Sequence, residues 1–191
     1  MDKLISVGKE FLEDRNQDKQ GSNSHGGGFF DRDDDDDFRT AKQEASQRAG
    51  SSGNSELFHS IISSIGQKQG KLADEDIDEE DAIKKYKKSY VDKDEDEEDE
   101  KSLGTAAAMH ALKLFNNGET GDKQGKGAFL GLALSEASKL FEEKASAGKV
   151  SSGTNKESVV QQAGEVAMKM YLKSQGQQQG GILGFASKFM K

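Results

Sequence analysis

The sequence predicts an all-α protein, a compact bundle of about five helices with disordered N-terminal and acidic linker segments. The phrase Ala-x-Lys-apolar-apolar recurs four times, and proline is absent, so glycine must mark the helix ends. On a helix, the phrase turns one small and two large apolar residues inward and its lysine to water. The copies lie at residues 111–115, 137–141, 167–171 and 186–190.

The composition limits the size of the core and the chemistry available to the chain. Only 32% of residues are apolar and the net charge is −8, so a sizeable part of the chain is expected outside any core. Cysteine is absent, which excludes disulfides, thiolate metal sites and cysteine nucleophiles. The acidic balance argues against nucleic-acid binding, because phosphate contacts need clustered lysine and arginine.

Both ends of the chain carry a short amphipathic pattern. Residues 1–13 predict a short helix with an apolar face, which is too short to be stable alone. Residues 177–191 predict a Gln/Gly spacer and a C-terminal amphipathic helix. Packing on the bundle or on a second copy is the preferred interpretation, with contact to a membrane surface as the alternative. The apolar face of the first helix comprises Leu4, Ile5, Gly8, Phe11 and Leu12.

Residues 14–53 form an Asp/Gly/Gln-rich segment that we expect to be disordered. It contains Gly26–Gly28 and the acidic run Asp33–Asp37. Such a composition cannot bury enough apolar surface to offset the entropy of the chain. The prediction allows at most a helical turn around Thr40–Arg48.

The predicted bundle domain spans residues 54–176, and its first two helices are separated by polar residues. Asn54 or Ser55 caps the first helix, which ends at Gly66 or Gly70. Asp74 or Asp76 caps the second helix, whose early acids and late lysines suit the helix dipole. The apolar stripe of the first helix is Leu57, Phe58, Ile61, Ile62 and Ile65; that of the second is Ile77, Ile83, Tyr86 and Tyr90.

An acidic linker, residues 92–101, interrupts the bundle domain, and mutual repulsion should keep its charges solvated. The third helix is expected to begin at Ser102 or Thr105 and to end before Gly118. A fourth helix is predicted from about Ala128 to Ala147. The fifth helix begins with the capping box Thr154-x-x-Glu157 and ends at Gly176.

No catalytic, cofactor-binding or metal-binding constellation stands out. Asp74–Asp78 resembles the start of a calcium loop, but Glu79 and Lys85 occupy its glycine and glutamate positions. The loop Gly118–Gly127 lacks the spacing of a phosphate loop. Convergent partners are not evident for any histidine. The three histidines are His25, His59 and His110.

One acidic aromatic stretch is a candidate docking motif for a protein partner. Phe29, Phe30 and Asp31 precede the acidic run, and Phe38 follows it. The stretch resembles the two-Phe acidic motif that docks on receptor domains of the endoplasmic reticulum. The match is partial, since Gly28 replaces the leading acid and Arg32 the small residue. The alternative interpretation is solubilising sequence without a partner.

The stretch from Leu57 to Met190 resembles an uncharacterised fungal family, sometimes labelled beta-flanking protein. The resemblance implies a Gly/Gln-rich cytosolic helical protein with a domain of unknown function, and it supplies no catalytic residues. The acidic runs Asp33–Asp37 and Asp92–Glu100 are additions to the family pattern. The matching pieces are residues 71–82, 106–113, 150–154 and 167–173.

These observations favour a non-enzymatic helical interaction or scaffold protein without cofactor or metal. Its protein partner is not identified by the sequence, and self-association into a homo-oligomer is expected through the amphipathic ends. The alternatives are a stress-protective hydrophilic protein, protective in heat or drying, and peripheral membrane association through the terminal helices. A cytoplasmic protein, with the nucleus also compatible, is expected because no apolar signal or membrane-spanning run is found.

Overall fold

A computed structural model describes residues 32–93, 96–121 and 125–176, and these residues form an all-α packed bundle. The predicted fold class is therefore confirmed, with six α-helices in the described residues rather than five. A 3₁₀ turn (η1, Gly50–Ser52) and a π-helical turn (η2, Lys87–Val91) follow two of them. The α-helices are α2 (Arg32–Ala49), α3 (Ser55–Asp74), α4 (Glu79–Tyr86), α5 (Glu100–Asn116), α6 (Lys126–Ser146) and α7 (Lys156–Gly176).

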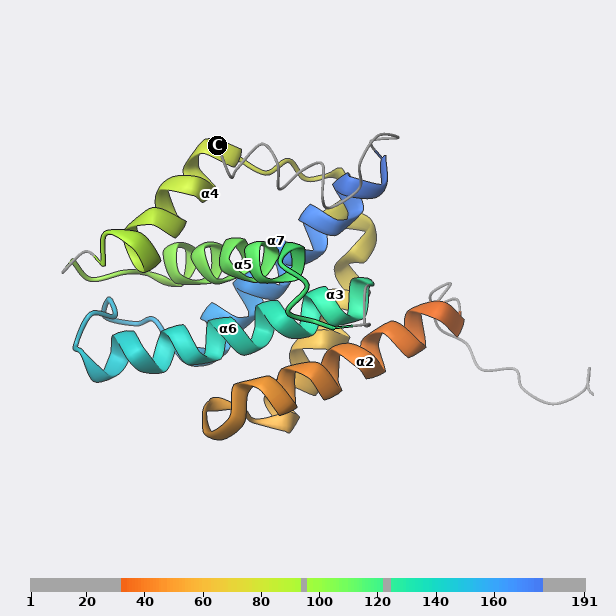
Figure 1. Ribbon diagram of the computed structural model, residues 1–191, viewed down its shortest axis with the longest axis horizontal. Helices are drawn as coiled ribbons and strands as arrows, with labels where there is room; N and C mark the ends of the chain where they lie inside the picture. Colours follow the sequence, from red (N-terminus) through yellow and green to blue (C-terminus); the bar gives the residue numbers. More distant parts are fainter. Residues whose placement is uncertain (1–31, 94–95, 122–124, 177–191) are drawn as a thin grey trace, which may run out of the picture.

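Helix α6 lies at the centre of the bundle. Every residue from Lys126 to Ser138 is buried, which is unusual for a helix that also contains charged side chains. Helices α2 and α5 run along opposite sides of α6, and α7 crosses behind them (Figure 1). Helix α4 lies at the periphery, where it packs on α5.

The repeated phrase forms the inner surface of the bundle, as predicted. Ala111, Ala137 and Ala167 are fully buried, one on each of α5, α6 and α7. The lysine does not always face water: only 16% of the Lys169 side chain is exposed, and it pairs with Glu75 at 2.5 Å. The fourth copy, residues 186–190, lies outside the described residues.

Helix α2 corrects the expected disorder of residues 14–53, because residues 32–53 are folded and packed. The helix is hydrophilic overall, but its alanines at spacing four are buried against α6. Alanine has high helix propensity, and a row of small side chains lets two helix backbones approach closely. Its acidic first turns also suit the helix dipole. The buried alanines are Ala41, Ala45 and Ala49.

Glycines of α6 make the contact with α2 possible. A Cβ atom placed on Gly131 would lie 2.6 Å from the carbonyl oxygen of Ala41 and 2.6 Å from the Cβ of Glu44. A Cβ on Gly127 would likewise collide with the backbone of Asp37. The two helices are therefore in backbone contact over about a full helical turn.

The first two predicted helices exist, with different bounds. Asn54 caps α3 by accepting hydrogen bonds from the amides of Glu56 and Leu57, as predicted. The predicted end at Gly66 or Gly70 is wrong, since α3 continues to Asp74 and packs along α7. The predicted caps of the second helix are also wrong. Asp78 caps α4 through the amide of Asp81, and residues 75–78 form the connection.

The acidic linker 92–101 is not uniformly solvated, which corrects the prediction. Glu98 is 1% exposed and forms an ion pair with Lys144, which is also buried, with Nζ and Oε1 2.7 Å apart. The hydroxyls of Ser89 and Ser102 donate hydrogen bonds to its other oxygen. An opposite charge and two donors offset the repulsion within the acidic run.

Helices α5 and α7 also begin away from their predicted caps. Asp99 caps α5 by accepting the amide of Ser102, so the helix begins at Glu100 inside the predicted linker. Asn155, not Thr154, accepts the amide of Ser158 at the start of α7. The Thr154 hydroxyl instead donates to Glu100, 3.3 Å away. The predicted ends of both helices agree with the structure, and α6 begins two residues before its predicted start.

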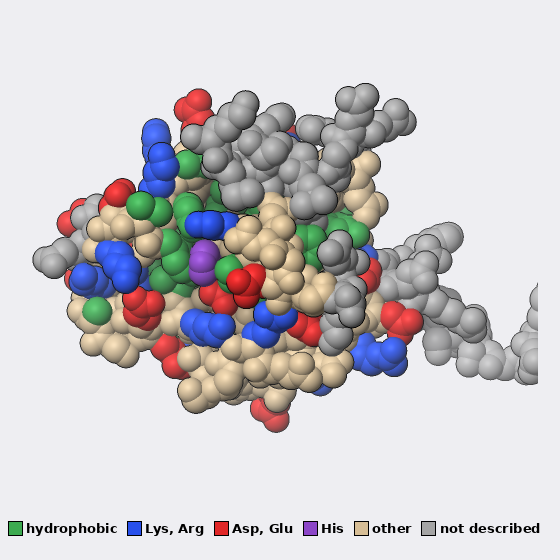
Figure 2. All heavy atoms as spheres, in the orientation of Figure 1, with side chains coloured by type: hydrophobic (Ala, Val, Ile, Leu, Met, Phe, Trp, Pro, Cys, Tyr) green, Lys and Arg blue, Asp and Glu red, His purple; other side chains and the backbone are tan. Residues whose placement is uncertain are grey.

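Ion pairs between α7 and the segment from α3 to the start of α4 cover the outside of the bundle. Lys68 pairs with Glu165 at 2.8 Å, and Lys173 pairs with Asp76. Positive and negative side chains lie next to one another on the face shown in Figure 2, rather than in separate fields. Each exposed pair contributes little by itself, so packing rather than charge holds α7 in place.

The predicted terminal helices, residues 3–13 and 182–190, lie outside the described residues. Among the helices that the structure describes, none combines the length and apolar character needed to cross a membrane.

We predict that Gly131→Ala lowers the free energy of unfolding by about 1–3 kcal/mol, because the new methyl group collides with the backbone of α2. Gly70→Ala is the matched control. It lies within α3 with open space around it and should stabilise the protein by about 0.5–1 kcal/mol. Urea unfolding measures both. Equal effects would contradict the close contact of α2 and α6.

We also predict that Glu98→Ala lowers the free energy of unfolding by about 3–5 kcal/mol, because Lys144 is left as a buried, unpaired charge. Asp96→Ala, in the same acidic run but with its side chain 79% exposed, should cost at most about 1 kcal/mol. A cost for Glu98→Ala no larger than for Asp96→Ala, measured by urea unfolding, would show that Glu98 is solvated after all.

Candidate functional site

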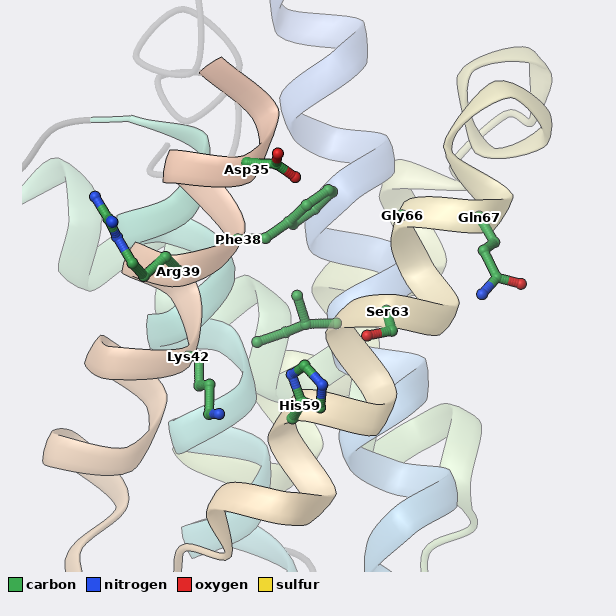
Figure 3. A pocket seen from close by; sticks show the side chains of 9 residues that line it. Asp35, Phe38, Arg39, Lys42, His59, Ser63, Gly66 and Gln67 are labelled. Atoms are coloured by element: carbon green, nitrogen blue, oxygen red, sulfur yellow. The ribbon is translucent and has the colours of Figure 1, made fainter. Parts of the chain in front are cut away.

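A groove of about 470 Å³ separates the N-terminal half of α2 from the middle of α3. Figure 3 shows one wall built from α2 and the other from α3. The exposed lining is mostly apolar, with charged groups toward its edges. The lining residues are Asp35, Phe38, Arg39, Lys42, His59, Ile62, Ser63, Gly66 and Gln67.

The groove exists because the two helices pack on different partners. Helices α2 and α3 are joined by the short turn η1 and begin as a hairpin. Helix α2 then follows α6, to which glycine contacts hold it, whereas α3 follows α7. The two helices therefore meet at the hairpin and leave a gap farther along, between Asp35 on α2 and Gln67 on α3.

The walls of the groove combine an apolar interior with a charged edge. Phe38 points across the gap toward α3, whereas Arg39 points to the outer side of α2 (Figure 3). Arg39 pairs with Asp36 at 2.8 Å on that outer side. The exposed Lys42 and His59 lie at the end nearer the hairpin and form no ion pair among the described residues. This arrangement suits an apolar ligand that carries negative charge at one end.

The second feature is a polar cluster, which connects the continuous segment of α4 and η2 to α5 and α6. The rings of Tyr90 and His110 stack with centroids 4.1 Å apart, and Tyr86 stacks on Tyr90 at 5.5 Å. His110 Nδ1 lies 3.1 Å from Glu136 Oε2, and Lys139 Nζ lies 2.9 Å from the other oxygen. The cluster thus joins three segments of the chain through one carboxylate.

The environment of this cluster changes the acidity of two of its members. Burial raises the pKa of the Glu136 carboxyl, but the hydrogen bonds from His110 and Lys139 outweigh burial and leave the pKa below its ordinary 4.5. Burial, aided by the nearby charge of Glu136, raises the pKa of Tyr90 well above its ordinary 10.0. The Tyr90 hydroxyl is buried without a hydrogen-bond partner in the described part of the chain. It is therefore a neutral phenol.

The structure places the residues singled out by sequence in three different situations. Of the candidate docking motif, Phe29, Phe30 and Asp31 lie outside the described residues, as does His25. Phe38 lies on α2, half-buried against the core, and its ring faces Lys126 Nζ at 5.5 Å. The remaining histidines belong to separate features, His59 to the groove and His110 to the polar cluster.

Sequence reasoning missed the residues that complete both features. Lys42 was part of a segment expected to be disordered, so no groove was foreseen. Glu136 lies within the fully buried stretch of α6, and no local pattern links it to His110. The spacing of Tyr86 and Tyr90 did place both on one face of a helix, which is the single signal that pointed toward the cluster.

The acidic residues near residue 76 do not converge into a cation site. Asp76 pairs with Lys173, and Asp78 caps α4. Among residues 32–93, 96–121 and 125–176, no group of three or more histidine, aspartate and glutamate side chains is placed to hold a metal ion.

A family model described as Domain of unknown function (DUF7721) matches residues 37–120. The match spans most of α2 and all of α3, α4 and α5, so it contains every groove-lining residue except Asp35. It stops before α6, the helix on which α2 and α5 pack. No curated protein matches the chain. No solved structure matches it either.

We predict that Glu136→Gln lowers the free energy of unfolding at pH 7 by about 1–3 kcal/mol, because it weakens hydrogen bonds from His110 and Lys139. Since the folded-state pKa of Glu136 is lowered, its stabilisation is present above pH 4.5 and is lost as the pH falls through that lower pKa. The difference between wild type and variant should therefore shrink in acid.

Urea unfolding between pH 7 and pH 3 measures this difference, at a fixed salt concentration. Glu143→Gln, at an exposed position of the same helix, is the matched control and should change stability little at any pH. A Glu136→Gln cost that stays constant into acid would contradict the proposed charge pairing.

Proposed function

We propose that the protein is a non-enzymatic interaction or scaffold protein, and that its groove between α2 and α3 holds an amphipathic helix with an apolar face and an acidic end. The groove itself is the observation that carries the proposal. It is open to solvent, mostly apolar, and bordered at one end by Lys42 and His59.

The dimensions of the groove support a helix as the ligand. Asp35 and Lys42 are seven positions apart, so the lined part of α2 is about 10 Å long, or two helical turns. Helices that pack together lie about 8–10 Å apart, and an incoming helix would contact both α2 and α3 at that distance. A groove between two helices that receives the apolar face of a third is a recurring mode of peptide recognition.

The charges support an orientation rather than a high affinity. Lys42 and His59 are exposed, and an exposed ion pair contributes at most about 1 kcal/mol. Acidic side chains at one end of the ligand would favour one direction of binding over the reverse. Affinity would come mainly from burial of the apolar face against Phe38 and Ile62.

Self-association is part of this proposal, since a second copy could supply such a helix.

The family assignment also remains a proposal: the DUF7721 match overlaps two of the four pieces that resemble the fungal beta-flanking family, residues 71–82 and 106–113. It adds no activity to the one proposed.

We predict that a synthetic amphipathic helix with a leucine face and a glutamate-rich end binds the native chain, and that Lys42→Glu weakens binding about fivefold. Lys71→Glu, an exposed position of α3 outside the groove, is the matched control and should bind normally. Fluorescence anisotropy with the labelled peptide measures the affinity.

Two further arms test the site itself. The same peptide with lysines in place of glutamates should bind more weakly to the native chain and more tightly to Lys42→Glu. Ser63→Trp should fill the groove and reduce binding of both peptides. Binding that ignores both changes, or no binding by any variant of the chain, would reject the groove as a docking site for a partner helix.

A further inference from the structure

From this groove and the sequence of the N-terminal segment, we propose that residues 3–13 of the same chain occupy the groove between α2 and α3. The inference rests on the proposed function, because it names the first ligand of the same site. A partner helix would then have to displace the chain's own segment.

The apolar face of residues 3–13 matches the lining of the groove. Leu4, Ile5, Phe11 and Leu12 share one side of a helix, with Gly8 between them. The lining is mostly apolar. One of its residues is Gly66, which has no side chain that would keep a ligand away from α3. A helix of eleven residues is about 16 Å long, enough to cover the lined part of both walls.

The charges of the segment are ordered in the same direction as those of the groove. Lys3 lies at its beginning, whereas Glu10 and Glu13 outnumber the single Lys9 toward its end. The groove has Asp35 at one end and Lys42 with His59 at the other. A segment that runs parallel to α2 therefore places Lys3 beside Asp35, and its two glutamates beside Lys42, with Lys9 as one like charge at that end. The reverse direction places both glutamates beside Asp35 and Lys3 beside Lys42.

The connection between the segment and α2 permits this direction. The end of the segment would lie beside Lys42, ten residues or about 15 Å along α2 from Arg32. Residues 14–31 are 18 residues rich in Gly, Ser, Asn, Gln and Asp, and such a chain spans about 23 Å on average. An intramolecular connection of this length gives an effective concentration in the millimolar range.

The other amphipathic end of the chain fits less well. Residues 182–190 contain Lys188 and no acidic residue, and Lys191 follows. Lys42 would repel such a segment, which offers no acidic side chain to the groove. The C-terminal segment is therefore the appropriate competitor in a test.

The absence of cysteine allows a disulfide-trapping experiment in the full chain. Gly8→Cys and Ser63→Cys are introduced together and oxidised in a glutathione buffer. Two matched pairs share one of these positions: Ser187→Cys with Ser63→Cys tests the C-terminal segment, and Gly8→Cys with Ser152→Cys tests random encounter with an exposed loop. Circular dichroism confirms that each variant folds.

The proposal expects an intramolecular disulfide in the first pair, at least about tenfold faster than in either matched pair. Glu10→Lys with Glu13→Lys should slow this reaction, and Lys42→Glu should restore it in that background. A disulfide that forms mainly between two chains would assign the segment to a second copy and overturn the intramolecular proposal. Faster trapping of residue 187, or equal rates in all three pairs, would overturn it as well.

The peptide titration separates failure of this inference from failure of the proposed function. If residues 3–13 occupy the groove, Leu4→Asp with Phe11→Asp should free it, and the glutamate-rich peptide should bind this variant at least about tenfold more tightly than the native chain. Equal binding to both would reject self-occupancy and retain the groove as a docking site. If the disulfide between positions 8 and 63 forms rapidly, but the peptide binds neither the native chain nor the variant with Leu4→Asp and Phe11→Asp, only the partner function would be rejected.

Discussion

The burial of α6 on every side from Lys126 to Ser138 is the constraint on which the rest of the structure depends. A helix buried all round must be approached by several other helices within a limited circumference. The chain meets this demand with small residues: Gly127 and Gly131 receive α2, while Ala137 lies in the fully buried stretch of α6. Because glycine removes side-chain volume, backbone contact replaces the interlocking of large side chains, and even a hydrophilic helix such as α2 can pack there.

The groove is a geometric consequence of this arrangement. Helix α2 follows α6 and α3 follows α7, so two helices joined by a short hairpin are pulled apart along their length. The floor between them stays apolar because the core continues beneath it through Ile62. The groove thus arises from how the helices around α6 and α7 divide between two centres, and its lining residues other than Asp35 lie within the range that the domain of unknown function matches.

Two charge clusters hold segments that hydrophobic packing reaches poorly. Glu98 fixes the acidic run to Lys144 on α6 and to Ser89 on η2. Glu136 binds His110, on which the ring of Tyr90 stacks. Glu98 is buried together with Lys144, whereas Glu136 is buried beside the half-buried His110 and the exposed Lys139. In both clusters the cost of desolvating the carboxylate is offset only while its partners are in place. The position of η2 is therefore fixed by these tertiary contacts rather than by the hydrogen bonds within the short helical turn itself.

The sequence by itself determined the fold class, the repeated inner face and a cap at Asn54 or Ser55, because helix periodicity and local capping depend on neighbouring residues. Tertiary structure alone decided that α2 is a helix, that Glu98 is buried, and that Glu136 meets His110. Each of these depends on a partner far away in the chain: glycines of α6 for α2, Lys144 for Glu98, and α5 beside α6 for Glu136. Composition reports average hydrophobicity, but the close approach of two backbones depends on which few small residues face each other.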